Sequence, residues 1–205
     1  MQAPSVIHPD TELRFVNREI GFGVVATRLI PKGAVTWVQD ELDQVFPPSR
    51  VESLDAVYQA VLRKYTFVNG RGEYILCWDL ARYVNHSCHP SCLSAGYNFE
   101  IAVRDIHPGE ELTDDYATLN LEDHFTCHCG APQCRGTVRE EDIYAQADHW
   151  DAVVGEAFPL IGTIPQPLWP LVAEKDAVQA ALSGAGGIAS CRLNLRGYQQ
   201  NVTSP

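Results

Sequence analysis

The hydrophobic residues near the start of the chain fall in short runs separated by glycine and proline. These runs cover residues 14–16, 21–26 and 30–38, and they are rich in β-branched and aromatic side chains. Such runs with Gly and Pro punctuation are typical of short strands joined by turns. The pattern therefore predicts a β-rich region over residues 13–38.

A helical pattern follows the break at Pro47-Pro48-Ser49. Ser49 and Glu52 have the spacing of an N-cap and its capping-box partner. The i, i+3, i+4 rhythm that follows is carried by Leu54, Val57, Tyr58, Val61 and Leu62. The spacing predicts one helix over about Val51 to Lys64.

Strand patterns return in the middle of the chain. Residues 65–68 and 74–78 flank a glycine turn at 69–72, and another strand pattern at 98–103 precedes a turn. We expect a meander of small strands here.

The composition changes beyond Arg139. Residues 142–155 and 167–182 have helix-like apolar spacing on either side of a proline-rich break. The stretch 183–205 is rich in Gly, Ser and Gln, and we expect it to be loosely held.

Length and charge narrow the classes of function. A chain of 205 residues suits one main domain, and its formal charge of −11 disfavours direct binding to nucleic acid while suiting a basic partner. No apolar run reaches the roughly 18 residues of a membrane span, and the first residues lack signal-peptide features. We expect an intracellular protein without membrane contact, in the cytoplasm, or in the nucleus if the source is eukaryotic.

Three of the seven cysteines crowd into a C-x-C-x4-C pattern: Cys127, Cys129 and Cys134. Thiolates this close in a Gly/Pro-containing loop favour a shared structural zinc ion over incidental thiols or redox chemistry. Such a site needs a fourth ligand, for which the chain offers Cys88, Cys92 and His128. Cys77 and Cys191 are interpreted as ordinary core or surface thiols.

Two polar segments carry further candidate chemistry. Residues 82–90 place Asn85 and His86 close to Ser87 and Cys88, but sequence neighbours rarely form a hydrolase triad because their side chains point apart. A second segment follows a proline-glycine turn and ends in Tyr116. Taken alone, Tyr116 is better interpreted as a half-buried strand aromatic than as a catalytic residue.

Four motifs taken together resemble the SET-domain protein-lysine methyltransferases. They are, in chain order, Gly21-Phe22-Gly23, the stretch Arg82 to Pro90, the stretch Gly109 to Tyr116, and the cysteine cluster of a post-SET zinc-binding loop. The resemblance covers about Leu13 to Gly136. No cysteine-rich segment precedes Gly21, so we expect no pre-SET zinc cluster.

The resemblance implies an α+β, mainly β fold, in which small curved sheets surround a C-terminal pseudoknot. It implies a SET domain at 13–120 with a variable insert at about 47–78, and a post-SET zinc loop at 121–138. A helical C-terminal extension with a loose tail would occupy 139–205.

The resemblance also implies an activity: transfer of a methyl group from S-adenosylmethionine to the side-chain amine of lysine in a protein. Tyr116 would be catalytic. The cofactor would be bound by Gly21, Phe22, Gly23, Arg82, Tyr83, Asn85, His86 and Tyr116. Structural Zn2+ would be bound by Cys88, Cys127, Cys129 and Cys134.

Substrate and product are less sharply defined by the sequence. We expect a lysine-containing protein or peptide, of basic character such as a histone-like tail, and no oligomeric state is indicated. Asp114 stands where many members of the family have Phe or Tyr, so the number of methyl groups added is left open; its carboxylate pairs with an incoming ammonium or turns to solvent. The alternative function is a catalytically silent SET module that binds a peptide or protein partner.

Overall fold

The computed structural model describes residues 6–198. Its strands are β1 (Thr11–Asn17), β2 (Gly21–Ala26), β3 (Val35–Val38), β4 (Gln44–Phe46), β5 (Thr66–Val68), β6 (Tyr74–Leu76), β7 (Asn85–His86), β8 (Cys92–Ser94), β9 (Phe99–Ala102), β10 (Thr113–Asp114), β11 (Phe125–Thr126) and β12 (Thr137–Val138). Its α-helices are α1 (Pro48–Glu52), α2 (Ala56–Tyr65), α3 (Asp142–Ala157) and α4 (Lys175–Leu182). Short 3-10 helices are η1 (Leu80–Tyr83), η2 (Tyr116–Leu119), η3 (Phe158–Gly162), η4 (Trp169–Leu171) and η5 (Cys191–Asn194).

The strands form small separate sheets, as the broken hydrophobic runs predict. Antiparallel pairing joins β1 to β2, β11 to β12, β3 to β9 and β8, and β4 to β6 and β5. The pair β7–β10 is parallel and joins two segments far apart in the sequence. This pair forms the centre of the candidate site.

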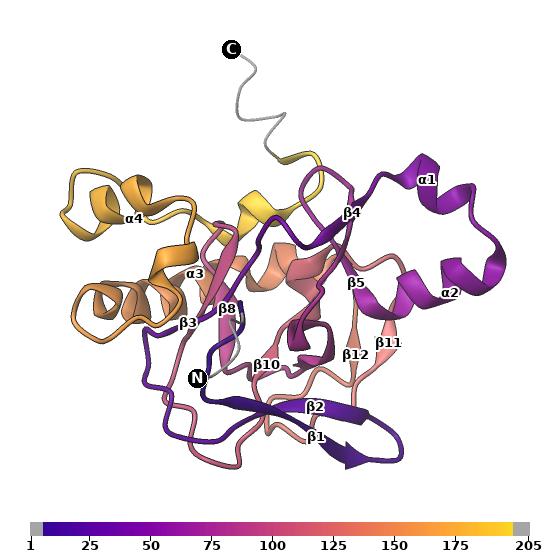
Figure 1. Ribbon diagram of the computed structural model, residues 1–205, viewed down its shortest axis with the longest axis horizontal. Coiled ribbons are helices and arrows are strands. Elements are labelled where there is room, and N and C mark those ends of the chain that lie inside the picture. The colour runs from indigo at the N-terminus through magenta and orange to yellow at the C-terminus, as the bar shows by residue number, and fades with distance from the viewer. Residues whose placement is uncertain (1–5, 199–205) are drawn as a thin grey trace.

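The helices lie on opposite sides of the sheets. In Figure 1, α1 and α2 project from one side, and α3 and α4 cover the other. Within residues 6–198, no helix is both long and apolar enough to cross a membrane.

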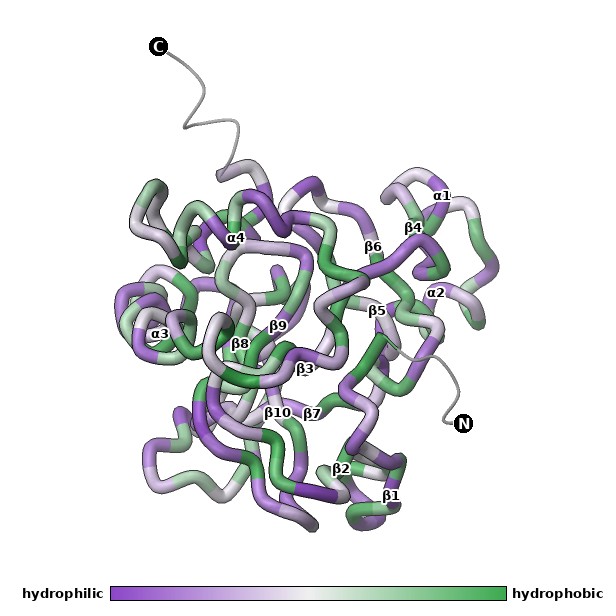
Figure 2. The backbone as a smooth tube through the Cα atoms, turned by 60° about the vertical axis from the view of Figure 1, so that its left-hand side comes forward, coloured by the Kyte–Doolittle hydropathy of each residue, from purple (hydrophilic) through white to green (hydrophobic). Residues whose placement is uncertain are grey.

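The main hydrophobic core lies where α3 packs on the sheet β3–β9–β8. Apolar residues of β8 and β9 run through the interior (Figure 2), and the helix adds Ile143, Ala147, Trp150 and Val154 to the same cluster. The predicted helix at 142–155 is therefore confirmed. The segment after residue 139 completes the core of the sheet rather than forming a separate unit.

The single helix predicted over 51–64 is wrong in its continuity. The structure has two helices, α1 and α2, because the chain turns at Ser53, whose hydroxyl donates to Arg50 O at 2.8 Å and competes with helical bonding. The apolar face is also mostly outside, since Val57 is 70% and Tyr58 is 59% exposed. The periodicity indicated a helix but not a buried one.

The expected helix at 167–182 is also shorter than its apolar spacing suggests. Trp169 to Leu171 form the 3-10 turn η4 around Pro170, and the α-helix begins only at Lys175. Proline cannot donate a backbone hydrogen bond, so a regular α-helix does not extend through Pro170.

The expectation of a loosely held stretch from residue 183 is wrong for residues 190–195, whereas residues 183–188 are exposed and residues 199–205 lie outside the described structure. Cys191 and Leu195 are buried in the main core. The Asp151 carboxylate accepts hydrogen bonds from Ser190 Oγ at 2.6 Å and from Cys191 N at 2.8 Å. Tertiary contacts outweigh the polar composition.

Asn120 fastens this C-terminal segment to the middle of the chain. Its amide nitrogen donates to Val68 O at 2.8 Å and to Asn194 O at 2.7 Å, and its oxygen accepts from Arg196 N at 2.8 Å. Asn120 is also buried and has a φ of +51°, a left-handed conformation that asparagine tolerates better than most residues.

We predict that Asn120→Ala lowers the free energy of unfolding by about 2–4 kcal/mol, because it strands buried backbone groups and strains the left-handed backbone. Asn120→Gly loses the same side-chain hydrogen bonds, but glycine adopts a positive φ without strain. This variant should therefore be about 1 kcal/mol more stable than Asn120→Ala. Urea denaturation of both variants measures the two contributions. Equal stability of wild type and Asn120→Gly would contradict the fastening role.

Candidate functional site

The parallel pair β7–β10 brings two of the sequence motifs side by side. Asn85 lies opposite Thr113, and His86 lies opposite Asp114. Buried Ser91 extends the contact, since its backbone N donates to Thr113 O at 3.0 Å and its hydroxyl accepts from Thr113 N at 2.8 Å. The two motifs therefore form one structural unit.

Tyr116 follows this pair directly and is fixed at both ends. Its hydroxyl donates to Val84 O at 2.7 Å, and its backbone N donates to His86 Nδ1 at 3.1 Å. Burial, and then the nearby carboxyl of Asp114, raise the pKa of Tyr116 above its ordinary value. The phenol thus stays protonated and oriented.

The His86 ring is held inside the protein. Its Nδ1 accepts from Tyr116, which places the proton on Nε2, 3.4 Å from Cys88 Sγ. Burial lowers the pKa of His86 to about 4, so the ring is neutral. His86 therefore links the tyrosine to the cysteine cluster, and its ring is not free to contact a ligand.

A buried ion pair joins the same tyrosine segment to the cysteine loop. Arg135 donates to both oxygens of Asp115, at 2.8 and 2.6 Å, and its Nε lies 3.1 Å from Asp142. Asp115 has no exposed surface on its side chain. The bidentate geometry fixes the loop after Cys134 against the backbone that carries Tyr116.

The glycine motif lies against Asn85. The Asn85 amide donates to Phe22 O at 3.0 Å and to the Glu111 carboxylate at 2.6 Å. A Cβ added at Gly23 would collide with that same carboxylate, whereas Gly21 has a φ of +86° and open space around it. Gly23 therefore permits the close approach of these groups.

Aromatic side chains flank this polar group. The ring of Phe22 meets that of Tyr83 edge to face, with 6.4 Å between centroids, and the Arg82 guanidinium lies 5.5 Å from the centre of the Tyr83 ring. The structure thus gathers the predicted cofactor residues into two neighbouring groups, one around Asn85 and one around Tyr116.

A cavity of about 620 Å3 opens beside Tyr116. Its wall includes Val84, Phe125, Asp114 and Glu100. Of the predicted cofactor residues, Arg82 and Tyr116 line this cavity, while the Gly21–Gly23 motif and Asn85 lie outside it. Tyr116 stands at the boundary between the cavity and the group around Asn85.

Asp114 is buried, with 3% of its surface exposed, so the alternative in which it turns to solvent does not occur. The Glu100 side chain of β9 lines the same cavity and lies close enough to Asp114 to share a hydrogen bond with it. Burial, and then the charge of Glu100, raise the pKa of Asp114 well above its ordinary value.

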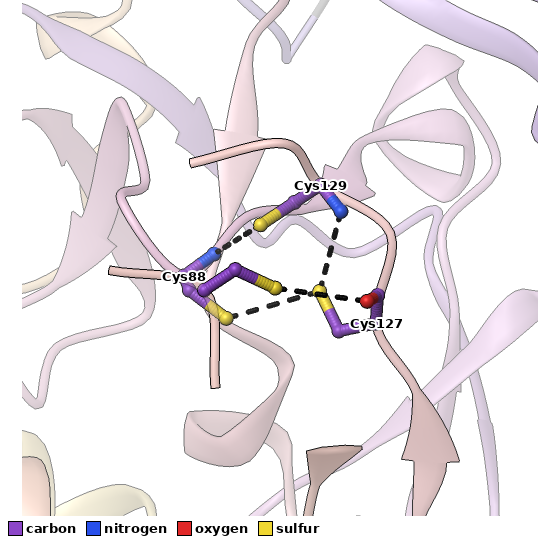
Figure 3. A group of neighbouring side chains, drawn as sticks. Cys88, Cys127 and Cys129 are labelled. Carbon is purple, nitrogen blue, oxygen red and sulfur yellow. Dashed lines mark hydrogen bonds between the residues drawn. The ribbon is translucent and has the colours of Figure 1, made fainter. Parts of the chain in front are cut away.

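The four predicted metal ligands meet at one point. The sulfur atoms of Cys88, Cys127, Cys129 and Cys134 all lie within 4.8 Å of one another. Figure 3 shows Cys88, Cys127 and Cys129 directing their sulfur atoms into a common space. The fourth member is therefore Cys88.

The two other candidates for the fourth ligand lie elsewhere. Cys92 is buried beside the Ser91 hydroxyl, and the largely exposed ring of His128 lies 3.9 Å from Glu19. In the cluster itself, burial works to raise the pKa of Cys129, but backbone N–H groups of Cys88 and Ala131 hold it lower, at about 6. The cluster thus favours a thiolate at Cys129, while burial raises the pKa values of Cys88 and Cys127.

Several residues of the site were not predicted from the sequence: Glu100, Glu111, Asp115, Phe125 and Arg135. Phe125 packs edge to face on His86 and Tyr116, at 5.3 and 6.0 Å between centroids. The one feature of the sequence that could have indicated Phe125 was its position just before the cysteine cluster. A lone Glu100 within a strand gives none.

Comparisons with known proteins agree with this geometry. Residues 21–117 match the family model described as the SET domain. The chain is 37% identical over 104 residues to histone-lysine N-methyltransferase TRX1 of Oryza sativa, covering 42% of the chain and 10% of that relative. It is 31% identical over 150 residues to histone-lysine N-methyltransferase Set2 of Drosophila melanogaster, covering 67% of the chain and 6% of that relative.

The similarity to a solved structure is weaker than the similarity in sequence. The methyltransferase domain of human histone-lysine N-methyltransferase SETMAR aligns with a TM-score of 0.44 and 21% identity, covering 65% of this chain and 58% of that one. The chain spans less than a fifth of the length of the curated relatives named above. The family match confirms the predicted fold of small sheets and helices: the chain contains a SET domain over residues 21–117 and is similar in sequence to histone-lysine N-methyltransferases.

Proposed function

We propose that the protein transfers a methyl group from S-adenosylmethionine to the side-chain amine of lysine in a protein substrate, such as a basic histone-like tail. The observation that carries the proposal is the half-buried Tyr116, fixed by two hydrogen bonds, between the 620 Å3 cavity and the group around Asn85. The similarity to histone-lysine methyltransferases supports the same reaction.

The residues around Asn85 suit the methyl donor. The open backbone at Gly21, the Glu111 carboxylate and the Asn85 amide offer both donors and acceptors for an amino-acid group. The exposed ring of Phe22 beside Tyr83 offers an aromatic surface for the adenine. S-adenosylmethionine would supply a methyl group on a positively charged sulfur.

The substrate lysine would occupy the cavity on the other side of Tyr116. The Tyr116 hydroxyl donates to Val84 O, so its oxygen lone pairs are directed to accept a hydrogen bond from the amine. This would align the amine with the methyl group, and catalysis would be chiefly positioning and electrostatics. His86 would act through Tyr116, since its ring is buried.

The cysteine cluster fits structural zinc. Cys88 Sγ and Cys127 Sγ are 3.8 Å apart. Tetrahedral zinc with Zn–S bonds near 2.3 Å places its sulfur ligands about 3.8 Å apart. Four thiolates close the coordination shell, so we assign the ion to holding Cys88 onto the loop 127–134 rather than to the reaction.

We predict that wild-type protein transfers radiolabelled methyl groups from S-adenosylmethionine to core histones. Tyr116→Phe should lower kcat by about 100-fold or more, because one oriented hydroxyl is lost, while calorimetry still detects cofactor binding. The matched control is Tyr144→Phe, which removes a hydroxyl from a tyrosine that is 73% exposed on α3. Its kcat should equal that of wild type.

The same experiment separates an enzyme from a silent module. Asn85→Ala should lose cofactor binding, because both its hydrogen bonds at the site disappear. Failure of well-folded wild type to bind S-adenosylmethionine would sink the proposed enzyme and favour a peptide-binding module.

We further predict one zinc ion per chain, measured by elemental analysis. Cys88→Ala should lose the ion and several kcal/mol of stability, because metal binding contributes directly to folding. Cys92→Ala also removes a thiol from the same segment, yet it should retain zinc and lose only about 1 kcal/mol from a small cavity. Equal zinc content in both variants would contradict the assignment of Cys88.

A further inference from the structure

The cavity beside Tyr116 holds a pair of carboxyl groups that the proposed reaction has not used. Glu100 comes from β9 and Asp114 from β10, and both side chains line the cavity. They lie close enough to share a hydrogen bond, and each affects the pKa of the other. Two carboxyls can share such a bond only when one of them carries a proton, so the pair holds one proton and one negative charge.

No cation neutralises this charge within residues 6–198. None of the ion pairs there includes Glu100 or Asp114, and the neighbouring Asp115 is taken up by Arg135. Unpaired buried charge is costly, and a protein keeps it where a ligand supplies the opposite charge.

Three other titratable groups near the pair are neutral. Cys77, after β6, and Cys92, on β8, are thiols whose pKa values burial raises. Tyr116, on η2, is a protonated phenol for the same reason. The pair is therefore the proton acceptor beside Tyr116, and the other carboxyl groups of the cavity wall belong to Glu122, Asp123 and Glu174.

Lysine needs such an acceptor. Its ammonium has an ordinary pKa of about 10.4 and cannot attack a methyl group until it loses a proton. Burial lowers the pKa of an ammonium and raises that of a carboxyl. Entry of lysine into the cavity therefore reduces the difference between the pKa of the ammonium and that of the carboxyl pair.

We propose that the Glu100–Asp114 pair accepts this proton from the substrate ammonium. This inference rests on the proposed function. The N–H bond of the ammonium breaks and an O–H bond forms on the pair, leaving a neutral amine and two protonated carboxyls. The amine nitrogen then forms its bond to the methyl carbon as the sulfur–carbon bond breaks, and the bonding electrons stay on sulfur.

The amine leaves as a methylated ammonium, and the pair returns its extra proton to water when the cavity empties. Every proton and electron pair is thus accounted for with the proposed methyl donor alone. Glu100 and Asp114 are in this scheme catalytic residues that contact the substrate nitrogen.

The test is the pH profile of single-turnover methyl transfer to core histones by wild type and by Glu100→Gln/Asp114→Asn. The rate of the wild type should be nearly independent of pH over about 8–10. The reason is that ammonium plus charged pair and amine plus protonated pair hold the same total number of protons, so moving the proton between them takes none from solvent. The double variant keeps the shape and the hydrogen bond but has no acceptor. Its rate should rise about tenfold per pH unit toward the lysine pKa of about 10.4.

At pH 7.5 we expect the double variant to be slower than wild type by about 100-fold or more, with the gap narrowing toward pH 10. The control variant Asp148→Asn removes a charge of the same sign from a side chain that is 93% exposed, and its profile should follow wild type. A double variant that binds S-adenosylmethionine and keeps the wild-type profile would overturn the inference alone.

Infrared difference spectroscopy provides a second measurement that needs no substrate. Wild type minus Asp114→Asn at neutral pH should show the C=O band of a protonated carboxylic acid. Absence of that band would overturn the shared proton, even if the double variant did not fold. Wild type that shows the band but methylates nothing would count against the proposed function, and with it against the proton transfer.

Discussion

The parallel contact between β7 and β10 is the constraint on which the rest of the site depends. It pairs two residues of one segment with two of another that is 28 positions further along the chain, Asn85 with Thr113 and His86 with Asp114. Isolated ladders of this length are not stable in water. The surrounding structure has to hold the two segments together, and the predicted functional residues gather where it does so.

Three independent sets of interactions hold that contact in place. Ser91 bonds to Thr113 on one side, and the bidentate pair of Arg135 with Asp115 holds the other. The cluster around Cys88 adds a third, because its sulfur lies among thiols of a loop about 40 residues later. The structural ion that we propose there would stabilise the position of Tyr116 without taking part in the reaction, through the short connection from the cysteine loop to Arg135.

The sequence predicted those parts of the site whose signal is local. Three cysteines in eight residues indicate a metal site by spacing alone, whereas the choice of Cys88 over Cys92 needed the family resemblance and then the fold. Glu100 could not be predicted, since a single carboxylate in a strand pattern looks like any exposed residue until the fold brings Glu100 and Asp114 into one cavity wall. The prediction of a loosely held segment at 191–195 failed for the same reason, because burial is a property of the tertiary structure.

Asp114 and Asp115 show how position along one backbone separates two identical groups. Successive residues of an extended chain point to opposite sides. Asp114 therefore lies in the cavity wall beside Glu100, while Asp115 meets Arg135. A carboxyl held by a guanidinium favours the charged form, and one held by a second carboxyl favours the protonated form. Two adjacent residues thus have different roles: Asp115 forms a fixed ion pair, and Asp114 belongs to a group that exchanges protons. Both directly precede Tyr116, which separates the cavity from the group around Asn85.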